Sequence, residues 1–206
     1  MILRGRGRRL AILSEASAVI FLYCIGAGAL WFILPPIAEH LVGNLALVGL
    51  LLAIPAVAGM LLDMPLGDLC DKIEKKTLLY WGLLIMAAAG LLLPQVTSLP
   101  RLIILLAAAG AVSSTLYIVT TTYVLAASPK KYSSSFLGTY TSFVHFGYSV
   151  GALLAGVAVA DAVLDNTPRI GLLMLASCVL AACAAATLTS HRRKCMRGGH
   201  KLGSQG

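Results

Sequence analysis

The sequence predicts an all-α polytopic membrane protein, in which one bundle of six transmembrane helices has both termini in the cytoplasm. Of its 206 residues, 59% are hydrophobic and 12% are charged, whereas a soluble domain has roughly 45–50% and about 25%. The apolar residues gather into six long stretches, and the basic residues lie between and beyond them. These observations exclude an ordinary soluble enzyme and a disordered or collagen-like chain.

Each apolar stretch is long enough to cross the bilayer as a helix, which needs about 20 mainly apolar residues. The six stretches are 11–38, 45–65, 77–97, 102–127, 134–162 and 168–190. The first, fourth and fifth are long enough to tilt or to extend beyond the hydrocarbon layer. The first is also too long for the apolar core of a signal peptide, so we expect it to be retained as a membrane span.

Turn residues mark the connections between these stretches. The breaks are Pro35-Pro36 with Glu39-His40, Pro100-Arg101, Ser128-Pro129-Lys130-Lys131 and Asp165-Asn166-Thr167-Pro168. All connections are short, so we expect no inserted soluble domain.

The basic residues predict the orientation of the helices. All of them except Arg101 and Arg169 fall on the side that holds the two termini and the second and fourth connections. The positive-inside rule places that side in the cytoplasm, and an even number of spans requires both termini on one side. Because the basic residues are divided among four segments, we expect no nucleic-acid partner. We expect an integral protein of the plasma (cytoplasmic) membrane.

No residue pattern points to catalysis, a metal or a cofactor. The five cysteines do not have zinc-ligand spacing, and we expect them to pack as small apolar residues. The sequence has no P-loop, no Gly-x-Ser-Gly nucleophile and no Asn-Pro-Ala repeat. We therefore expect a protein that is not an enzyme and that needs no cofactor.

The connection between the second and third stretches carries an ordered motif. It reads Gly67-Asp68-Leu69-Cys70-Asp71-Lys72-Ile73-Glu74-Lys75-Lys76-Thr77-Leu78-Leu79. This segment resembles the signature loop of the major facilitator superfamily, G-x-L-a-D-r-x-G-r-k-x-x-l, which that family also places on the cytoplasmic side after its second helix. Glu74 departs from the glycine that the family has there for a tight turn.

The resemblance implies that this loop is a gate. Gly67, Asp71, Lys72, Lys75 and Lys76 would hold two helix bundles in the outward-facing state and release them in another. Asp71 at a helix end can pair with a lysine or with the positive N-terminus of another helix. The alternative is that these charges only anchor the topology, as in any short cytoplasmic loop.

The glycines of the fifth stretch carry a second resemblance. Gly147, Gly151 and Gly156 match part of the motif found in the fifth helix of exporters of the family, with Ala152 in place of its proline. The resemblance implies efflux. The alternative is a generic packing face, on which small residues let two helices cross closely.

The family fold has twelve helices in two similar halves, each made of two three-helix units related by inversion. This chain resembles one half, with units at about 1–98 and 99–190 and a basic tail at 191–206. A cavity between bundles needs a second bundle, which a homodimer, a separate chain or a further part of the same protein could supply. Equally spaced glycine pairs in the second and fifth stretches agree with the inverted repeat: Gly49 with Gly67, and Gly138 with Gly156.

Polar residues inside a span are costly and by default face an interior cavity. His145 lies near the middle of the fifth stretch with Tyr148 on the same side of the helix, and a histidine can exchange a proton near neutral pH. Ser114, Tyr117 and Thr121 follow a helical spacing and would line one face of the fourth stretch. We expect these five residues to bind substrate or couple protons. The alternatives are a hydrogen-bonded interhelical histidine and hydroxyl groups that join helices or bond their own backbone.

The acidic residues of the spans lie near the span ends. Glu15 is close to the cytoplasmic end of the first stretch, and Asp63 is near the end of the second, beside the signature loop. Asp161 and Asp165 are at the outer end of the fifth stretch, where we expect them to be solvated. None of them is among the residues expected to line the cavity.

These features predict a secondary active transporter of the major facilitator type. It would move a small organic solute across the cell membrane between two bundles, with proton-coupled export as the expected mode. The expected partners are the lipid bilayer, the solute, and a second copy or another six-helix bundle. The alternative is a non-transporting six-helix membrane scaffold, or a transporter half that needs a second bundle.

Overall fold

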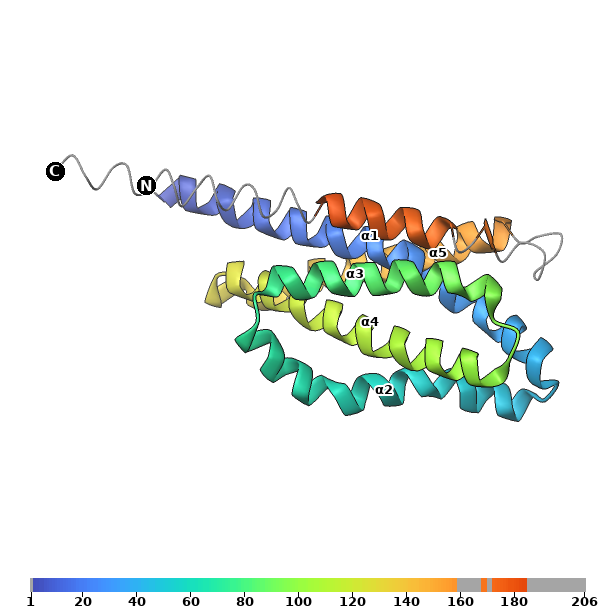
Figure 1. Ribbon diagram of the computed structural model, residues 1–206. Coiled ribbons are helices and arrows are strands. Elements are labelled where there is room, and N and C mark those ends of the chain that lie inside the picture. The colour runs from blue at the N-terminus through green and yellow to red at the C-terminus, as the bar shows by residue number, and fades with distance from the viewer. Residues whose placement is uncertain (1, 159–167, 170–171, 185–206) are drawn as a thin grey trace.

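The computed structural model describes residues 2–158, 168–169 and 172–184, and all of the long elements in that part of the chain are helices (Figure 1). The five labelled helices are α1 (Ile2–Val42), α2 (Leu45–Lys72), α3 (Lys75–Leu92), α4 (Leu99–Ala127) and α5 (Ser133–Ala158). A sixth apolar helix, Leu172–Ala184, is the red ribbon of Figure 1. Short 3₁₀ turns follow α3 (η1, Leu93–Gln95) and precede α5 (η2, Lys130–Tyr132).

Within the described residues, five helices are long and apolar enough to cross a membrane. Their apolar segments are Leu13–Val42, Leu45–Asp68, Thr77–Gln95, Leu99–Ala126 and Ser133–Ala158. The helix Leu172–Ala184 lies inside the sixth predicted stretch and is shorter, and the remainder of that stretch is largely outside the described residues. The predicted all-α membrane bundle is therefore confirmed.

The end of the first helix differs from the prediction. Pro35 and Pro36 lie inside α1, which continues to Val42. A proline removes one backbone hydrogen bond and kinks a helix, but membrane helices tolerate this because neighbouring helices stabilise them. The helix ends instead at Gly43, whose φ of 65° is open to glycine and costly for other residues. The Gly43 N–H donates to the carbonyl of Glu39 at 2.7 Å and closes the last turn.

The other predicted breaks differ in outcome. Ser128-Pro129 follows the end of α4 as predicted, whereas Pro100-Arg101 lies in the first turn of α4. The break at Asp165-Asn166-Thr167-Pro168 lies largely outside the described residues. The side-chain oxygen of Asn44 accepts a hydrogen bond of 2.9 Å from the Ala46 N–H and caps the start of α2. Glu74 separates α2 from α3 with a φ of −60° and a ψ of 118°. This extended conformation suits any residue, so the turn forms without the glycine that the family usually has there.

Helix α1 runs through the centre of the bundle. It packs most extensively against α5, while α4 lies between α2 and α3 (Figure 1). The sixth helix runs beside α1, because a Cβ added at Gly26 would lie 3.2 Å from the Cα of Met174. Small residues at such crossings bring helix backbones together, which is how helices associate in a bilayer that offers little hydrophobic driving force.

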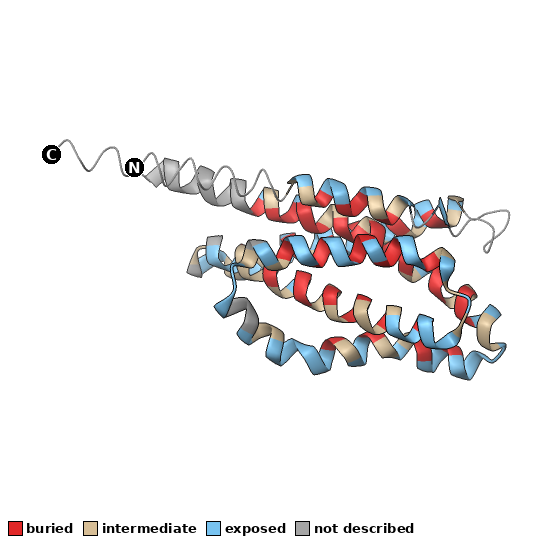
Figure 2. Cartoon of the chain, in the orientation of Figure 1, coloured by how far each residue is buried: buried red, intermediate tan, exposed pale blue. Residues whose placement is uncertain are grey.

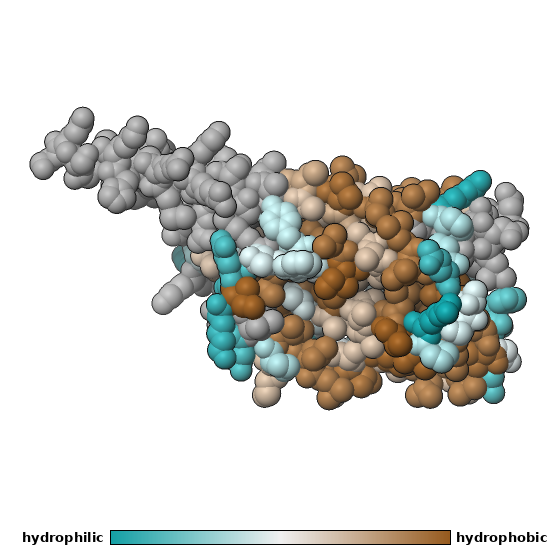
Figure 3. Space-filling view, in the orientation of Figure 1, coloured by the Kyte–Doolittle hydropathy of each residue, from teal (hydrophilic) through white to brown (hydrophobic). Residues whose placement is uncertain are grey.

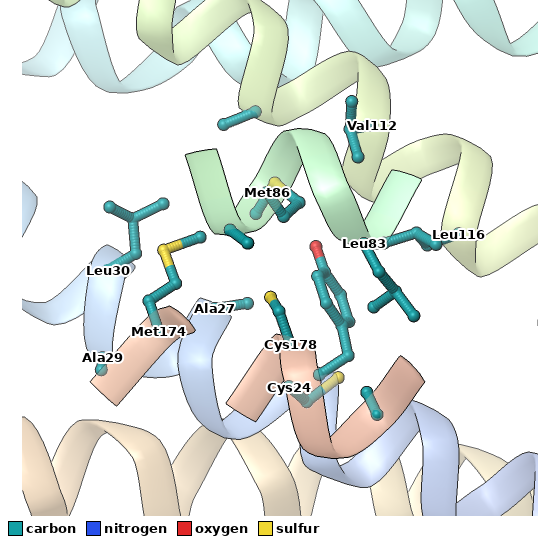
Figure 4. Packing of buried hydrophobic residues seen from close by; sticks show 14 of the residues in the cluster. Cys24, Ala27, Ala29, Leu30, Leu83, Met86, Val112, Leu116, Met174 and Cys178 are labelled. Atoms are coloured by element: carbon teal, nitrogen blue, oxygen red, sulfur yellow. The ribbon is translucent and has the colours of Figure 1, made fainter. Parts of the chain in front are cut away.

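The core is formed where α1, α3, α4 and the sixth helix meet. Cys24, Met86, Leu116, Met174 and Cys178 are almost fully buried there (Figure 4). In contrast, α2 is exposed along most of its length (Figure 2). Cys24 and Cys178 are free thiols in the apolar core, in line with the predicted packing role, whereas Cys183 is exposed. The side chains of Cys70 and Cys195 lie outside the described part of the structure.

Polar and apolar side chains are distributed over the surface as expected for a protein in a bilayer. A band of hydrophobic side chains crosses the visible face, and hydrophilic side chains gather toward its two ends (Figure 3). Lys72 and Lys75 lie at the end where α2 connects to α3, and Arg101 lies at the opposite end, where α4 begins. The protein is therefore an integral membrane protein with its helices across the apolar layer.

Candidate functional site

A groove with a volume of about 410 Å³ opens between α1, α2, α4 and α5. This volume is in the range of roughly 300–1,000 Å³ found for sites that bind small molecules. Its lining consists of Trp31, Leu52, Pro55, Ala56, Gly59, Met60, Asp63, Gly110, Ser113, Ser114, Tyr117 and Tyr148. A carboxylate, two serines and three aromatic side chains thus meet in a groove whose remaining lining is apolar or glycine.

Close contact between α2 and α4 sets the floor of this groove. A Cβ added at Gly110 of α4 would lie 2.5 Å from the Cα of Pro55 on α2, so only glycine fits there. A Cβ added at Gly59 would lie 3.4 Å from the Ser114 Oγ. The two backbones therefore touch immediately beside the polar residues, which fixes where those residues face each other.

Asp63 and Ser114 form a hydrogen bond across this contact. The Ser114 hydroxyl donates to Oδ1 of Asp63. Asp63 is five residues before Asp68, where the apolar segment of α2 ends, which corresponds to about 7.5 Å along the helix axis at about 1.5 Å per residue. The carboxylate is therefore inside the span, toward its end beside the signature loop. The bond from Ser114 leaves acceptor positions open, since a carboxylate has about four lone-pair sites.

Aromatic side chains form the walls of the groove. Trp31 comes from α1, Tyr117 from α4 and Tyr148 from α5. Tyr148 enters the groove where α5 crosses α1, since a Cβ added at Gly28 would lie 2.9 Å from the Tyr148 Cα. Further along, the Tyr23 hydroxyl and the Ser113 Oγ are 2.7 Å apart and join α1 to α4.

The groove brings together three of the five predicted substrate residues. Ser114, Tyr117 and Tyr148 line it. Thr121 does not line the groove, and its hydroxyl oxygen is buried. His145 is also outside the lining, and its side chain is exposed on α5.

The position of His145 follows from helix geometry. Three residues separate it from Tyr148, so the two side chains point about 60° apart at about 100° per residue. The hydroxyls near it bond their own helix: Thr141 Oγ1 donates to the Leu137 carbonyl at 2.9 Å, and Ser149 Oγ donates to the His145 carbonyl at 3.0 Å. The predicted polar face of α5 is therefore exposed beside the groove and only Tyr148 enters it.

The sequence places Asp63 near the end of the second stretch but does not include it among the cavity residues. The position is confirmed, since Asp63 lies five residues before the end of the apolar segment Leu45–Asp68. The structure adds that Asp63 contacts Ser114 in the groove. The signal was available, since an ionisable residue within an apolar stretch is a functional candidate by default.

The signature loop is the connection from α2 to α3. The side chain of Lys72 is exposed and that of Lys75 is half-buried. The side chains of Asp71 and Lys76 lie outside the described part of the structure. Nothing in the described chain lies within 4 Å of a Cβ added at Gly67, so the close helix approach expected there is not made inside this bundle.

The fifth-helix glycines lie along the contact with α1. A Cβ added at Gly147 would lie 2.7 Å from the Cβ of Cys24, and one at Gly151 would lie 2.8 Å from the carbonyl carbon of Ile25. Gly156 is different, because its added Cβ would make only an ordinary contact of 3.5 Å with Phe32. Packing within the bundle thus requires glycine at the first two positions and permits other residues at the third.

Comparison with known proteins identifies the family. The family model described as Major Facilitator Superfamily matches residues 16–197, which include the apolar helices apart from the first residues of the span in α1. No curated protein and no solved structure matches the chain. Together with the helical bundle and the apolar spans, this match shows that the chain belongs to the Major Facilitator Superfamily of membrane transporters, as a bundle of the kind that forms one half of such a transporter.

Proposed function

We propose that the protein moves a small organic solute across the membrane, and that the groove between α1, α2, α4 and α5 is half of the solute-binding cavity. The observation that carries this proposal is the carboxylate of Asp63, bonded to Ser114 in an open groove within the spans. A charged side chain inside a membrane span is costly, with about 2.5–3.5 kcal/mol at the helix centre on insertion scales and less toward the ends. A water-accessible solute path accommodates the Asp63 carboxylate better than contact with lipid does.

A second helix bundle would complete the cavity. Exposed small and polar residues follow α5 beside the groove: Gly138, Ser142, His145 and Ser149. Nothing in the described chain lies within 4 Å of a Cβ added at Gly49, Gly67 or Gly138. Because small residues are typical of membrane helix contacts, these faces of α2 and α5 suit a partner bundle, from a second copy, another chain or a further part of the protein.

The signature loop would control the exchange between states. Lys72 and Lys75, with Asp71, Lys76 and Gly67, would contact the partner bundle in the outward-facing state and separate in the other. The charge distribution of the sequence supports a cytoplasmic location for this loop and for both termini. We propose the plasma membrane as the location of the protein.

Proton-coupled export is the mode we propose. His145 lies near the middle of α5 beside the groove, where its imidazole could accept and pass on a proton. Thr121, one turn beyond Tyr117 on α4, would support the wall of the cavity. The direction rests on the resemblance of Gly147, Gly151 and Gly156 to the exporter motif.

A flux assay in proteoliposomes tests this proposal. Panels of neutral, anionic and cationic organic solutes would be measured with and without a pH gradient, using protein of known oligomeric state. We expect flux of at least one class, stimulated by the gradient, and loss of that stimulation in His145→Ala. His40→Ala is the matched control, because His40 is exposed near the end of α1.

The same assay tests the proposed role of the signature loop as a gate. Asp71→Asn should slow flux, whereas Asp68→Asn, the same change three residues earlier, should not. A non-transporting scaffold predicts no solute flux for any of these proteins even though they fold and bind a partner chain. That result would contradict the proposal.

A further inference from the structure

The described lining of the groove contains an acidic side chain and no basic side chain. Among the described residues that line it, Asp63 carries a charge, and the others are apolar, hydroxyl-bearing or aromatic. None of these lining residues is basic. An anionic solute would therefore meet a negative charge with no compensating cation in this half of the cavity.

The hydrogen bond from Ser114 positions the Asp63 carboxylate. The Ser114 hydroxyl donates to Oδ1 of Asp63. The contact between α2 and α4 at Gly110 and Gly59 fixes this pair in place. The carboxylate is thus held in the groove and does not need to be rearranged when a solute enters.

Three aromatic rings in the groove provide further groups that can interact with a cation. Trp31, Tyr117 and Tyr148 reach the groove from three different helices. The face of an aromatic ring attracts a cation, and aromatic side chains together with a carboxylate are a common way to bind ammonium groups. Tyr117 is also supported from behind by Tyr140, with ring centroids 6.1 Å apart.

We propose that the solute class selected by this groove is an organic cation, with its positive nitrogen or phosphorus centre beside Asp63 and its apolar body against Trp31, Tyr117 and Tyr148. This inference rests on the proposed function in that it names the solute class for the same groove. The apolar lining from Leu52, Ala56 and Met60 suits the hydrocarbon part of such a molecule. No covalent step is involved.

Equilibrium binding tests this inference without any flux measurement. The full-length protein in nanodiscs would be titrated with radiolabelled tetraphenylphosphonium, with empty nanodiscs subtracted, and with tetraphenylborate as an anion of nearly the same shape. We expect saturable binding of the cation and at least about tenfold weaker binding of the anion. The loss of an interaction with a charged group lowers affinity by about this factor. Equal affinities, or no saturable binding of the cation, would overturn the inference.

Substitutions of Asp63 test whether the cation binds beside this residue. Asp63→Asn should weaken cation binding by about tenfold or more, whereas Asp68→Asn, on the same helix and outside the groove lining, should bind as the wild type does. Asp63→Glu retains the charge and should recover most of the affinity. Unchanged binding in a folded Asp63→Asn variant would overturn the inference, and if that variant does not fold, the comparison of cation with anion on the wild type decides.

The two proposals fail in different ways. Flux of neutral or anionic solutes with no cation binding would contradict the cation inference and leave the transport proposal standing. Saturable cation binding without flux of any solute would contradict transport and leave the binding chemistry of the groove standing.

Discussion

At the scale of single residues, Asp63 is the group on which the proposed function most depends. Its carboxylate is within an apolar helix, where an isolated charge is expensive, and the Ser114 hydroxyl provides a hydrogen bond from the neighbouring helix. Polar groups inside a membrane protein are tolerated when they are paired or line a water-filled cavity. Asp63 meets both conditions, since it is bonded and lies in the groove.

Removal of the Ser114 hydroxyl should weaken solute binding without unfolding the protein. Ser114→Ala keeps the charge of Asp63 and removes its donor, and a hydrogen bond to a charged group is worth about 1.5–3 kcal/mol, so we expect a rise in KM of about tenfold. The matched control is Thr122→Ala on the same helix, whose hydroxyl donates to the Ile118 carbonyl at 2.6 Å. Equal KM values for both variants in the flux assay would contradict the role of Ser114.

The glycines of α5 should differ sharply in their tolerance to alanine. A Cβ at Gly151 would lie 3.0 Å from the Ala29 N and closer still to the Ile25 backbone, so Gly151→Ala must separate α1 from α5. We expect a loss of about 1–3 kcal/mol in the free energy of unfolding, as for other overpacked sites, measured by reversible unfolding in mixed micelles.

Gly138→Ala is the control for that experiment. Nothing in the described chain lies within 4 Å of its added Cβ, and the substitution has the same effect on helix propensity. Its unfolding free energy should equal or exceed that of the wild type. A loss as large as that of Gly151→Ala would show that helix packing is not the cause.

The sequence predicted some of these placements and missed others for a physical reason. Small residues at Gly147 and Gly151 predicted a close helix crossing, and these residues do lie against α1. The sequence could not tell which flank of α5 faces the groove, because that depends on how α5 crosses α1. Tyr148 therefore lines the groove and His145 lies beside it.

At the scale of elements, the ends of the helices decide which residues lie inside the membrane. Pattern analysis ended the first helix at Pro35-Pro36 and the second at 65, and both helices are longer. Proline is a reliable terminator in water, but in a packed membrane bundle it does not stop the helix. The positive φ of Gly43 does. Asp63 is near the loop end of its span, as predicted, and it also lines the groove.

Substitution of Gly43 tests the account of helix termination. No atom of the described chain lies within 4 Å of its added Cβ, so any effect comes from the backbone conformation alone. Gly43→Ala should lower the free energy of unfolding by about 1 kcal/mol, because alanine disfavours positive φ. Gly43→Asn should cost less, since asparagine adopts this conformation more readily. The same unfolding assay would contradict the account if both variants matched the wild type.

At the scale of the whole molecule, α5 has two exposed faces of different character. Ser142, His145 and Ser149 lie beside the groove, whereas Phe146 and Leu153 point toward the remaining side. Lipid suits the apolar face and a protein partner suits the polar one. The family match and the apolar spans were predictable from the sequence, but this division of α5 required the packed bundle.

Photocrosslinking in native membranes should distinguish the two faces. A benzophenone maleimide attached to Ser142→Cys is expected to capture a protein, and the same reagent on Leu153→Cys should react with lipid. A product of twice the mass identifies a second copy, and another mass identifies a separate chain. Protein capture from neither position, in a folded protein, would contradict a second bundle at this face.

The most direct measurement is solute flux through Asp63→Asn compared with Asp68→Asn in proteoliposomes of equal protein content. Both variants remove one carboxylate from α2, but only the first removes it from the described lining of the groove. The account predicts that Asp68→Asn transports at the wild-type rate and that Asp63→Asn loses at least about nine-tenths of the flux, in line with a lost charged interaction. Equal flux through the two folded variants would contradict the claim that this groove is the solute path.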